Sequence, residues 1–146
     1  MTRTVYVNGD YLPEGEARVS IFDRGFLMAD AVYEVTSVLD GKLIDFDGHV
    51  KRLARSLAEL EMTCPVSDTE LLAMHRELVA RNGIDQGMIY LQITRGVALR
   101  DHVMPADITP TVFVMTNAMK PVPAEQRSQG VACVTADDFR WEKAHI

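Results

Sequence analysis

The chain has 146 residues, of which 47% are hydrophobic and 25% charged, and it carries a net charge of −6 at neutral pH. This composition is ordinary for a globular domain that buries a core of its own, and it excludes a general description as a disordered segment. The acidic balance also excludes a sequence-blind nucleic-acid binder, because such a protein needs a basic surface to replace the counterions on phosphate.

The sequence contains no window that approaches the roughly 18 to 20 apolar residues of a membrane span. Residues 1–6 contain no long apolar stretch, so we expect no secretory signal. Cys64 and Cys133 lie far apart, and the histidines show no metal-ligand spacing. We therefore expect a cytoplasmic protein without a metal site, a membrane partner or a nucleic-acid partner.

Two hairpins are predicted in the first third of the chain. Residues 4–12 contain the turn dipeptide Asn8-Gly9, which supplies the positive backbone angles of a type I′ turn. Residues 32–44 are predicted to form a second hairpin, with longer strands on either side of Asp40-Gly41. Between the two hairpins, a turn and the start of an amphipathic strand are the plain structural interpretation.

Two helices follow the second hairpin. The first is predicted to be capped by Asp47 and to run to about Met62, with apolar residues spaced for one buried face. The second is predicted to begin near Ser67, whose spacing to Glu70 fits a capping box. Its end is expected at Asn82, because the glycine that follows is a good C-terminal stop.

Strands fill most of the remaining sequence. Residues 88–94 and 111–115 are predicted to be long buried strands, because both are rich in β-branched and aromatic residues. The proline-containing stretch 120–123 indicates a linker. It leads into a further predicted strand, which begins at Val131 and reaches about residue 138.

This order predicts an α+β fold in which residues 1–119 form a small N-terminal domain, 120–130 a linker, and 131–146 the start of a larger domain. A single strand in the last segment cannot bury its apolar side chains alone. We therefore expect its sheet to come from further sequence or from another chain.

Several charged residues have both a structural and a chemical interpretation. Lys51, Arg52 and Arg55 form a basic cluster on the first helix, and such clusters are usually solvated helix faces. The alternative is an anion site, because a guanidinium can hold phosphate or carboxylate through two parallel hydrogen bonds. Arg100 and His102 follow the strand 88–94 on a loop, where they are either solvent-facing or able to donate to a carboxylate.

Together and in this order, the motifs resemble those of the D-amino acid aminotransferases, which belong to the class IV (fold-type IV) pyridoxal-phosphate enzymes. The motif Arg-x-His after the strand points to the D-amino acid branch in particular. The resemblance covers essentially the whole chain and is carried by Asp23-Arg24-Gly25, Asp30 to Glu34, His49 to Leu53, Thr94-Arg95-Gly96, Arg100-Asp101-His102, and Arg140-Trp141 to Ile146.

The resemblance implies a small N-terminal domain of the fold-type IV enzyme, followed by the first strand of the larger cofactor-binding domain. It implies pyridoxal 5′-phosphate as the cofactor, with Arg52 in contact with the cofactor phosphate. Tyr33, Arg100 and His102 are implied to bind the substrate carboxylate. In that family the arginine and histidine loop reaches the site across a homodimer interface.

The implied activity is transamination between a D-amino acid, such as D-alanine, and a 2-oxo acid, such as 2-oxoglutarate. The Schiff-base lysine is expected immediately after Ile146, so no catalytic residue is assigned within this chain, and Lys143 has the wrong place in the motif. We accordingly expect the coding sequence to continue.

Two other interpretations remain open. An L-branched-chain aminotransferase or an aminodeoxychorismate lyase would keep the fold and cofactor, although Arg100 with His102 argues against both. A protein of a different class, a catalytically inert association domain, would use neither cofactor nor substrate.

Overall fold

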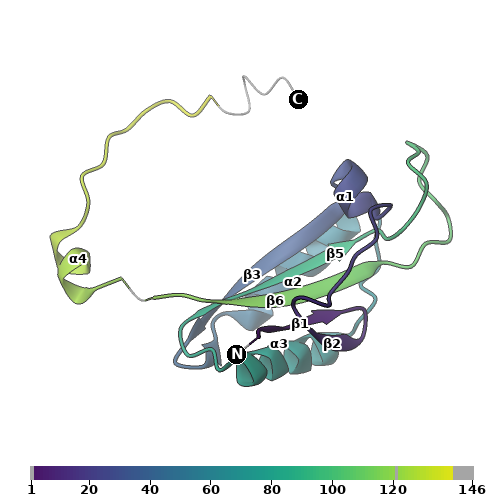
Figure 1. Cartoon of the computed structure of the whole chain (residues 1–146). Helices are drawn as coiled ribbons and strands as arrows, with labels where there is room; N and C mark the ends of the chain where they lie inside the picture. The colour runs from purple at the N-terminus through teal and green to yellow at the C-terminus, as the bar shows by residue number, and fades with distance from the viewer. Residues whose placement is uncertain (1, 121, 140–146) are drawn as a thin grey trace.

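The computed structural model describes residues 2–120 and 122–139, which form a six-stranded antiparallel sheet with helices (Figure 1). The strand order is β2-β1-β6-β5-β3-β4, and the expected α+β class is confirmed. The strands are β1 (Thr4–Val7), β2 (Asp10–Pro13), β3 (Ala31–Leu39), β4 (Lys42–Leu43), β5 (Gly87–Thr94) and β6 (Thr111–Ala118). The helices are α1 (Arg24–Met28), α2 (Phe46–Glu59), α3 (Asp68–Asn82) and α4 (Ala124–Gln129).

Both predicted hairpins are confirmed. β1 pairs with β2 across Asn8 and Gly9, whose φ angles are 49° and 111°. β3 pairs with β4 across Asp40 and Gly41, with φ angles of 50° and 69°. Asparagine, aspartate and glycine tolerate these left-handed conformations better than other residues, so the turn chemistry fixes the position of each hairpin.

Helix α2 differs from its prediction at both ends. Asp45, with φ of 50°, occupies the N-cap position, so the helix begins at Phe46 rather than after Asp47. Asp47 lies in the first turn, where its negative charge faces the positive end of the helix dipole. The last residue is Glu59, three residues before Met62.

Helix α3 follows its prediction closely. The hydroxyl of Ser67 accepts a hydrogen bond from the Glu70 amide at 3.3 Å, and the Glu70 carboxylate accepts one from the Ser67 amide at 2.7 Å. This is the predicted capping box. Gly83 ends the helix in the left-handed conformation.

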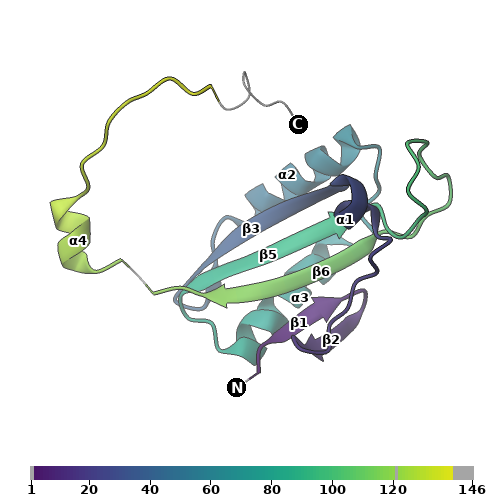
Figure 2. The same cartoon turned by 45° about the horizontal axis from the view of Figure 1, so that its top comes forward.

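Helices α2 and α3 cover one face of the sheet, and the core lies between the two layers (Figure 2). Successive side chains of a strand point to opposite faces, and buried positions largely alternate along β3, β5 and β6. Burial of the apolar side chains supplies the main driving force for this packing. The core consists of Val38, Leu53, Leu57, Leu71, Met74, Leu78, Ile84, Ile89, Leu91, Ile93, Val112 and Val114.

The C-terminal segment corrects one prediction. Residues 131–139 contain no strand, and Val131 and Val134 are 77% and 94% exposed. The segment forms an arc that stands clear of the sheet (Figure 1), and a strand requires a neighbouring strand for its backbone groups. The predicted linker 120–130 contains the short helix α4, and the motif 140–146 lies outside the described residues.

Among the described residues, no helix is both long and apolar enough to cross a membrane. The same part of the chain contains no cluster of three or more side chains that could hold a metal ion.

Candidate active site

A carboxylate held by two cationic side chains lies where β3 meets α2. Glu34 points to the helix-covered face and is 3% exposed. Its Oε1 accepts a hydrogen bond from Arg52 Nε at 2.8 Å, and its Oε2 accepts one from Arg52 Nη2 at 2.6 Å. His49 Nδ1 lies 2.8 Å from the same Oε2. Because His49 and Arg52 are three residues apart on α2, they project from the same side of the helix.

The electrostatics of this cluster keep the Glu34 carboxylate charged. Burial alone would raise the pKa of Glu34, but the hydrogen bonds from Arg52 and His49 outweigh it and hold that pKa below its ordinary value. In turn, the hydrogen bond and charge of Glu34 raise the pKa of Arg52.

Arg52 keeps donors for a ligand. Its side chain is 55% exposed, whereas that of Glu34 is buried. A guanidinium carries five N–H donors, and the two bonds to Glu34 use one edge of the fork. Among the described residues, no acceptor is bound to Arg52 Nη1. The pair therefore presents a fixed cationic edge to solvent, and such an edge fits a phosphate group.

Tyr33 occupies the opposite face of β3 from Glu34 and is 63% exposed. Its ring stacks on that of Tyr90, with centroids 5.5 Å apart and planes 16° apart. Tyr90 in turn packs against Phe113 and donates its hydroxyl proton to Gln92 at 2.8 Å. These contacts restrict the Tyr33 ring and leave its hydroxyl accessible.

Arg100 and His102 lie apart from Tyr33 and Arg52 within one chain. Both are exposed on the loop formed by residues 97–110, which projects beyond the end of the sheet (Figures 1 and 2). In the described part of the chain, no hydrogen bond or ion pair joins either residue to Tyr33 or Arg52. Among the described residues, no hydrogen bond, ion pair or ring contact joins any two of the four predicted site residues, so a single chain does not assemble them by direct contact.

A second ionic cluster was not expected from the sequence. Arg24 and Asp30 have side chains that are 2% and 8% exposed, and that of Arg95 is 9% exposed. Asp30 Oδ2 accepts hydrogen bonds from Arg24 Nε at 2.7 Å and from Arg95 Nε at 2.8 Å. One further donor of each guanidinium reaches a backbone carbonyl, Arg24 Nη1 at Asp101 at 2.8 Å and Arg95 Nη2 at Leu60 at 2.7 Å.

Asp30 is ionised in this cluster. Burial alone would raise the pKa of Asp30, but hydrogen bonds from Arg95 and Arg24 outweigh it and hold that pKa below its ordinary value. The sequence had indicated a plain turn around Arg24 and no ionic partner for Arg24 or Arg95. Both guanidiniums are buried instead, because each pairs with the same carboxylate and with a backbone acceptor.

The motif Asp23-Arg24-Gly25 joins α1 to the end of β5. Asp23 accepts hydrogen bonds from the Gly25 amide at 2.8 Å and from the Thr94 hydroxyl at 3.0 Å. A Cβ on Gly25 would lie 2.5 Å from Thr94 Cγ2, so a side chain does not fit there. Local sequence gives the helix cap, but the contact with Thr94 depends on the tertiary fold.

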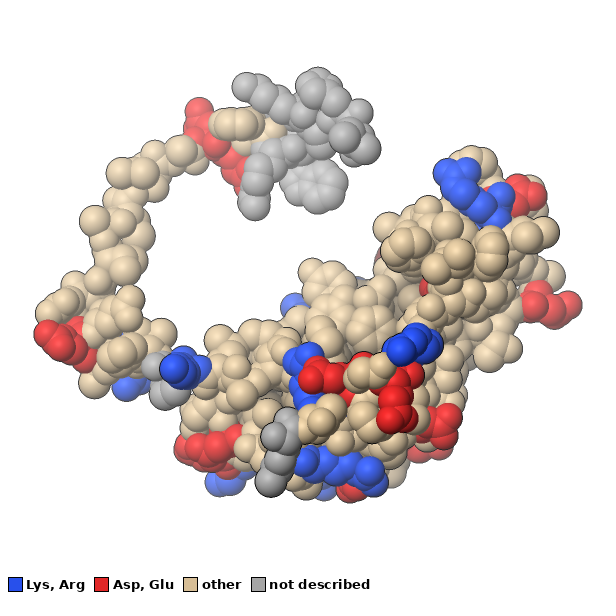
Figure 3. Space-filling view, in the orientation of Figure 1, with Lys and Arg blue, Asp and Glu red and all other residues tan. Residues whose placement is uncertain are grey.

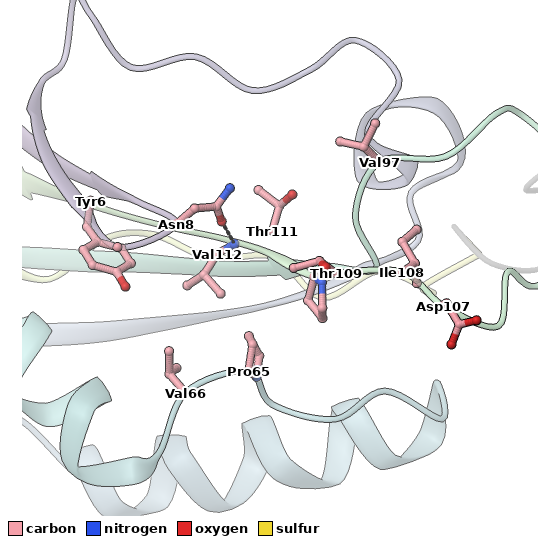
Figure 4. A pocket seen from close by; sticks show the side chains of 12 residues that line it. Tyr6, Asn8, Pro65, Val66, Val97, Asp107, Ile108, Thr109, Thr111 and Val112 are labelled. Carbon is pink, nitrogen blue, oxygen red and sulfur yellow. Dashed lines mark hydrogen bonds between the residues drawn. The ribbon is translucent and has the colours of Figure 1, made fainter.

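A separate hollow of about 630 Å³ lies between the start of β6, the end of β1 and the chain before α3 (Figure 4). It contains none of the four predicted site residues. Asn8, on its wall, is already bound through Oδ1 to the Val112 amide at 2.8 Å (Figure 4). Of the described residues that line it, Asp107 is the one charged side chain, and a carboxylate repels anionic ligands. The hollow therefore does not fit a phosphate or a substrate carboxylate.

A comparison with known protein families identifies the family of this chain. Residues 31–145 match the family model described as amino-transferase class IV. The chain belongs to the class IV aminotransferase family. The resemblance noted from the motifs is thereby confirmed at the level of the family.

Curated relatives narrow the comparison. The chain is 40% identical over 145 residues to a D-alanine aminotransferase of Listeria monocytogenes serotype 4b (strain F2365), covering 97% of this chain and 50% of that protein. It is 39% identical over 142 residues to a D-alanine aminotransferase of Bacillus licheniformis, with the same coverage of 97% and 50%. The chain therefore spans about half the length of these relatives.

Solved structures with this fold include a branched-chain amino acid aminotransferase with pyridoxamine 5′-phosphate. The TM-score is 0.77 at 24% identity, and the match covers 86% of this chain and 43% of that one. The branched-chain amino acid aminotransferase from Escherichia coli gives a TM-score of 0.76 at 19% identity, covering 82% and 42% of the two chains. At these identities the likeness confirms the fold alone.

Proposed function

We propose that this chain is the N-terminal part of a pyridoxal-phosphate-dependent D-amino acid aminotransferase. The enzyme transfers the amino group of a D-amino acid such as D-alanine to a 2-oxo acid such as 2-oxoglutarate. The main support is the identity of 40% to a D-alanine aminotransferase over 97% of the chain. Residues 1–119 are the small domain in this proposal, 120–130 the linker, and 131–146 the start of the cofactor-binding domain.

The proposed cofactor contact is Arg52. A phosphate dianion requires fixed, charged donors, and Glu34 holds the guanidinium while its outer edge remains exposed. This donor set fits the phosphate of pyridoxal phosphate. When bound, that cofactor supplies the electron sink for removal of the α-proton of an amino acid.

Tyr33, Arg100 and His102 are the proposed binding group for the substrate carboxylate. The stacked Tyr33 ring offers a hydroxyl, Arg100 a permanent charge, and His102 a tunable one. Fixing the carboxylate decides which face of the α-carbon is turned to the base, and hence the chirality of the product. The base in this proposal is the lysine expected immediately after Ile146.

In this proposal a homodimer completes the group, because the loop carrying Arg100 and His102 projects beyond the end of its own sheet (Figure 1). Much of the surface at this end of the molecule is uncharged in the space-filling view (Figure 3). Exposed apolar patches of this kind mark association surfaces. The exposed apolar side chains of residues 19–26 and of the loop are Val19, Ile21, Phe22, Phe26, Val97, Leu99, Val103 and Met104, each between 45% and 82% exposed.

We place the protein in the cytoplasm. Both cysteines, Cys64 and Cys133, are free thiols. Free thiols persist in a reducing compartment, where pyridoxal-phosphate chemistry on small metabolites also takes place.

The test is an assay of the full-length protein reconstituted with pyridoxal phosphate. We expect turnover of D-alanine with 2-oxoglutarate, and a visible absorbance band from the bound cofactor that borohydride abolishes. Faster turnover of L-leucine would replace the proposal with a branched-chain aminotransferase. Absence of both the band and the turnover would leave the association domain as the remaining interpretation.

A further inference from the structure

We propose that Arg24 is a positioning residue for substrate binding, because it holds the main chain between Arg100 and His102. This inference rests on the proposed function of those two residues. In this proposal, a buried side chain outside the Glu34–Arg52 pair affects how well the enzyme binds a carboxylate.

The geometry that carries the proposal is a direct bond. Arg24 Nη1 donates to the carbonyl oxygen of Asp101 at 2.8 Å. Asp101 lies between Arg100 and His102, so a fixed carbonyl at this position restricts the backbone from which both side chains extend. Arg24 Nη2 also approaches the sulfur of Met104 at 3.7 Å, a weak contact on the returning part of the loop.

Other anchors for this part of the loop are scarce. The base of the loop is tied by the backbone, through Arg24 N to Gly96 O at 2.8 Å and Ala98 N to Phe22 O at 3.2 Å. Of the hydrogen bonds identified among the described residues, those that join residues 99–107 to the folded body come from the Arg24 side chain. The bond from Val103 N to Asp101 Oδ1 lies within the loop itself.

The anchor is rigid at its other end. Arg24 Nε is bound to Asp30, and the same carboxylate oxygen is held by Arg95, which is fixed in turn to Leu60 O. Side chains in such a network have few alternative rotamers. The Arg24 guanidinium therefore links the loop to side chains that are themselves held in place.

Charge makes a purely structural role a poor explanation. Asp30 and Arg95 already form a neutral buried pair, and Arg24 adds a second buried cation for which, among the described residues, Asp30 is the one ion-pair partner. Burying an extra charge is unfavourable unless its donors are used. The donors that Asp30 does not accept are directed to the loop.

The matched variants are Arg24→Met, Arg24→Lys and Arg95→Met in the full-length protein loaded with pyridoxal phosphate. Arg24→Met removes one buried cation, leaves the neutral pair and cannot bond to Asp101. Arg24→Lys keeps the charge, but its single ammonium lacks the fork that joins Asp30 to the loop. Arg95→Met removes the same charge from the same carboxylate and leaves the bond to Asp101 intact.

The first readout is hydrogen exchange of the peptide covering residues 98–105, which does not depend on activity. We expect faster exchange in Arg24→Met and Arg24→Lys, with Arg95→Met close to the wild type. Equal exchange in all four proteins would overturn the proposal. If Arg24→Met does not yield folded protein, Arg24→Lys decides by the same criterion.

The second readout compares D-alanine with D-alaninol, in which the carboxylate is replaced by a hydroxymethyl group. We expect Arg24→Met to lower kcat/KM for D-alanine by about tenfold or more, mainly through KM, because misplacement of binding groups is costly. For D-alaninol, kcat/KM should stay within about twofold of the wild-type value, since D-alaninol has no carboxylate for these residues to bind. A parallel fall for both substrates overturns positioning. A wild type inactive on D-alanine refutes the proposed function instead, and hydrogen exchange still decides whether Arg24 anchors the loop.

Discussion

Two ionic clusters, whose carboxylates are four residues apart along the chain, each join one carboxylate to two basic side chains but differ in their exposure. In one, Glu34 lies between Arg52 and His49, and in the other Asp30 lies between Arg24 and Arg95. Both carboxylates are buried and both have a pKa held below the ordinary value. The difference lies in the cations, because Arg52 is 55% exposed while Arg24 is 2% exposed.

This difference indicates that the exposure of the guanidinium assigns the role of an arginine. Every guanidinium nitrogen shown to bond in the Asp30 cluster ends on a protein atom, at Asp101, Leu60 or Met104. Arg52 has an outward edge with no acceptor among the described residues. We therefore expect substitutions in the Asp30 cluster to act on folding and on the loop, and substitutions around Glu34 to act on ligand binding.

The largest expected effect is that of Asp30→Asn on folding. Without the carboxylate, two buried guanidiniums face each other unpaired, and breaking a buried pair costs about 3–5 kcal/mol. Urea denaturation of the full-length protein measures the loss in unfolding free energy. Glu34→Gln is the control, because Arg52 can turn into solvent, and we expect a clearly smaller loss. Equal losses would remove the distinction between the clusters.

A smaller loss is expected from Gly25→Ala. The added methyl group would meet Thr94, which is bonded to Asp23, so the end of β5 must shift. Overpacking of this kind costs roughly 1–3 kcal/mol. Gly15→Ala is the matched control, because nothing lies within 4 Å of a Cβ there. Thermal denaturation of both variants checks the difference, and similar melting temperatures would show that the contact is dispensable.

Glu34→Gln should have its main effect on the cofactor. The neutral amide holds Arg52 less firmly, so we expect the Kd of pyridoxal phosphate to rise about fivefold. Pyridoxal without its phosphate is the control ligand, and its affinity should change little. Equal weakening for both ligands would mean that Glu34 acts elsewhere in the site.

The smallest expected effect is on the pH dependence of stability. The pKa of Glu34 is lower in the folded than in the unfolded chain, so the unfolded chain takes up this proton first as the pH falls. Its stabilisation is therefore complete above the unfolded pKa of about 4.3 and is lost as the pH falls through the folded pKa. The stability difference between wild type and Glu34→Gln should therefore shrink as the pH falls below about 5. A difference that grows toward acid would have the wrong sign.

The sequence predicted the turns and the helix cap of this fold, which depend on neighbouring residues. Asn8-Gly9, Asp40-Gly41 and the capping box of Ser67 with Glu70 act through neighbouring residues, and each is where it was expected. The start of α2 was missed by two residues, because two aspartates compete for the cap. The predicted strand at 131–138 is absent from the described residues because a strand depends on a partner, which periodicity does not provide.

The candidate site was predictable only in part. The chemistry of Arg52 as an anion donor follows from its side chain, but the assignment of Tyr33, Arg100 and His102 came from the resemblance and stays a prediction. The Asp30 cluster was missed, because Arg24 and Arg95 are separated by most of the small domain and meet only in the folded chain. Asp30 and Glu34 were both visible as part of one motif, but nothing in the sequence marked which arginine each would hold.

The most direct test compares Arg52→Met with Arg95→Met in the full-length protein, by measuring the Kd of pyridoxal phosphate for both. We expect Arg52→Met to raise this Kd by about tenfold or more, because it removes charged hydrogen bonds to phosphate. Arg95→Met should leave the Kd within about twofold, since all of its assigned donors end inside the protein. If Arg95→Met weakens cofactor binding as much as Arg52→Met does, burial and free donors do not separate the two clusters, and the account is wrong.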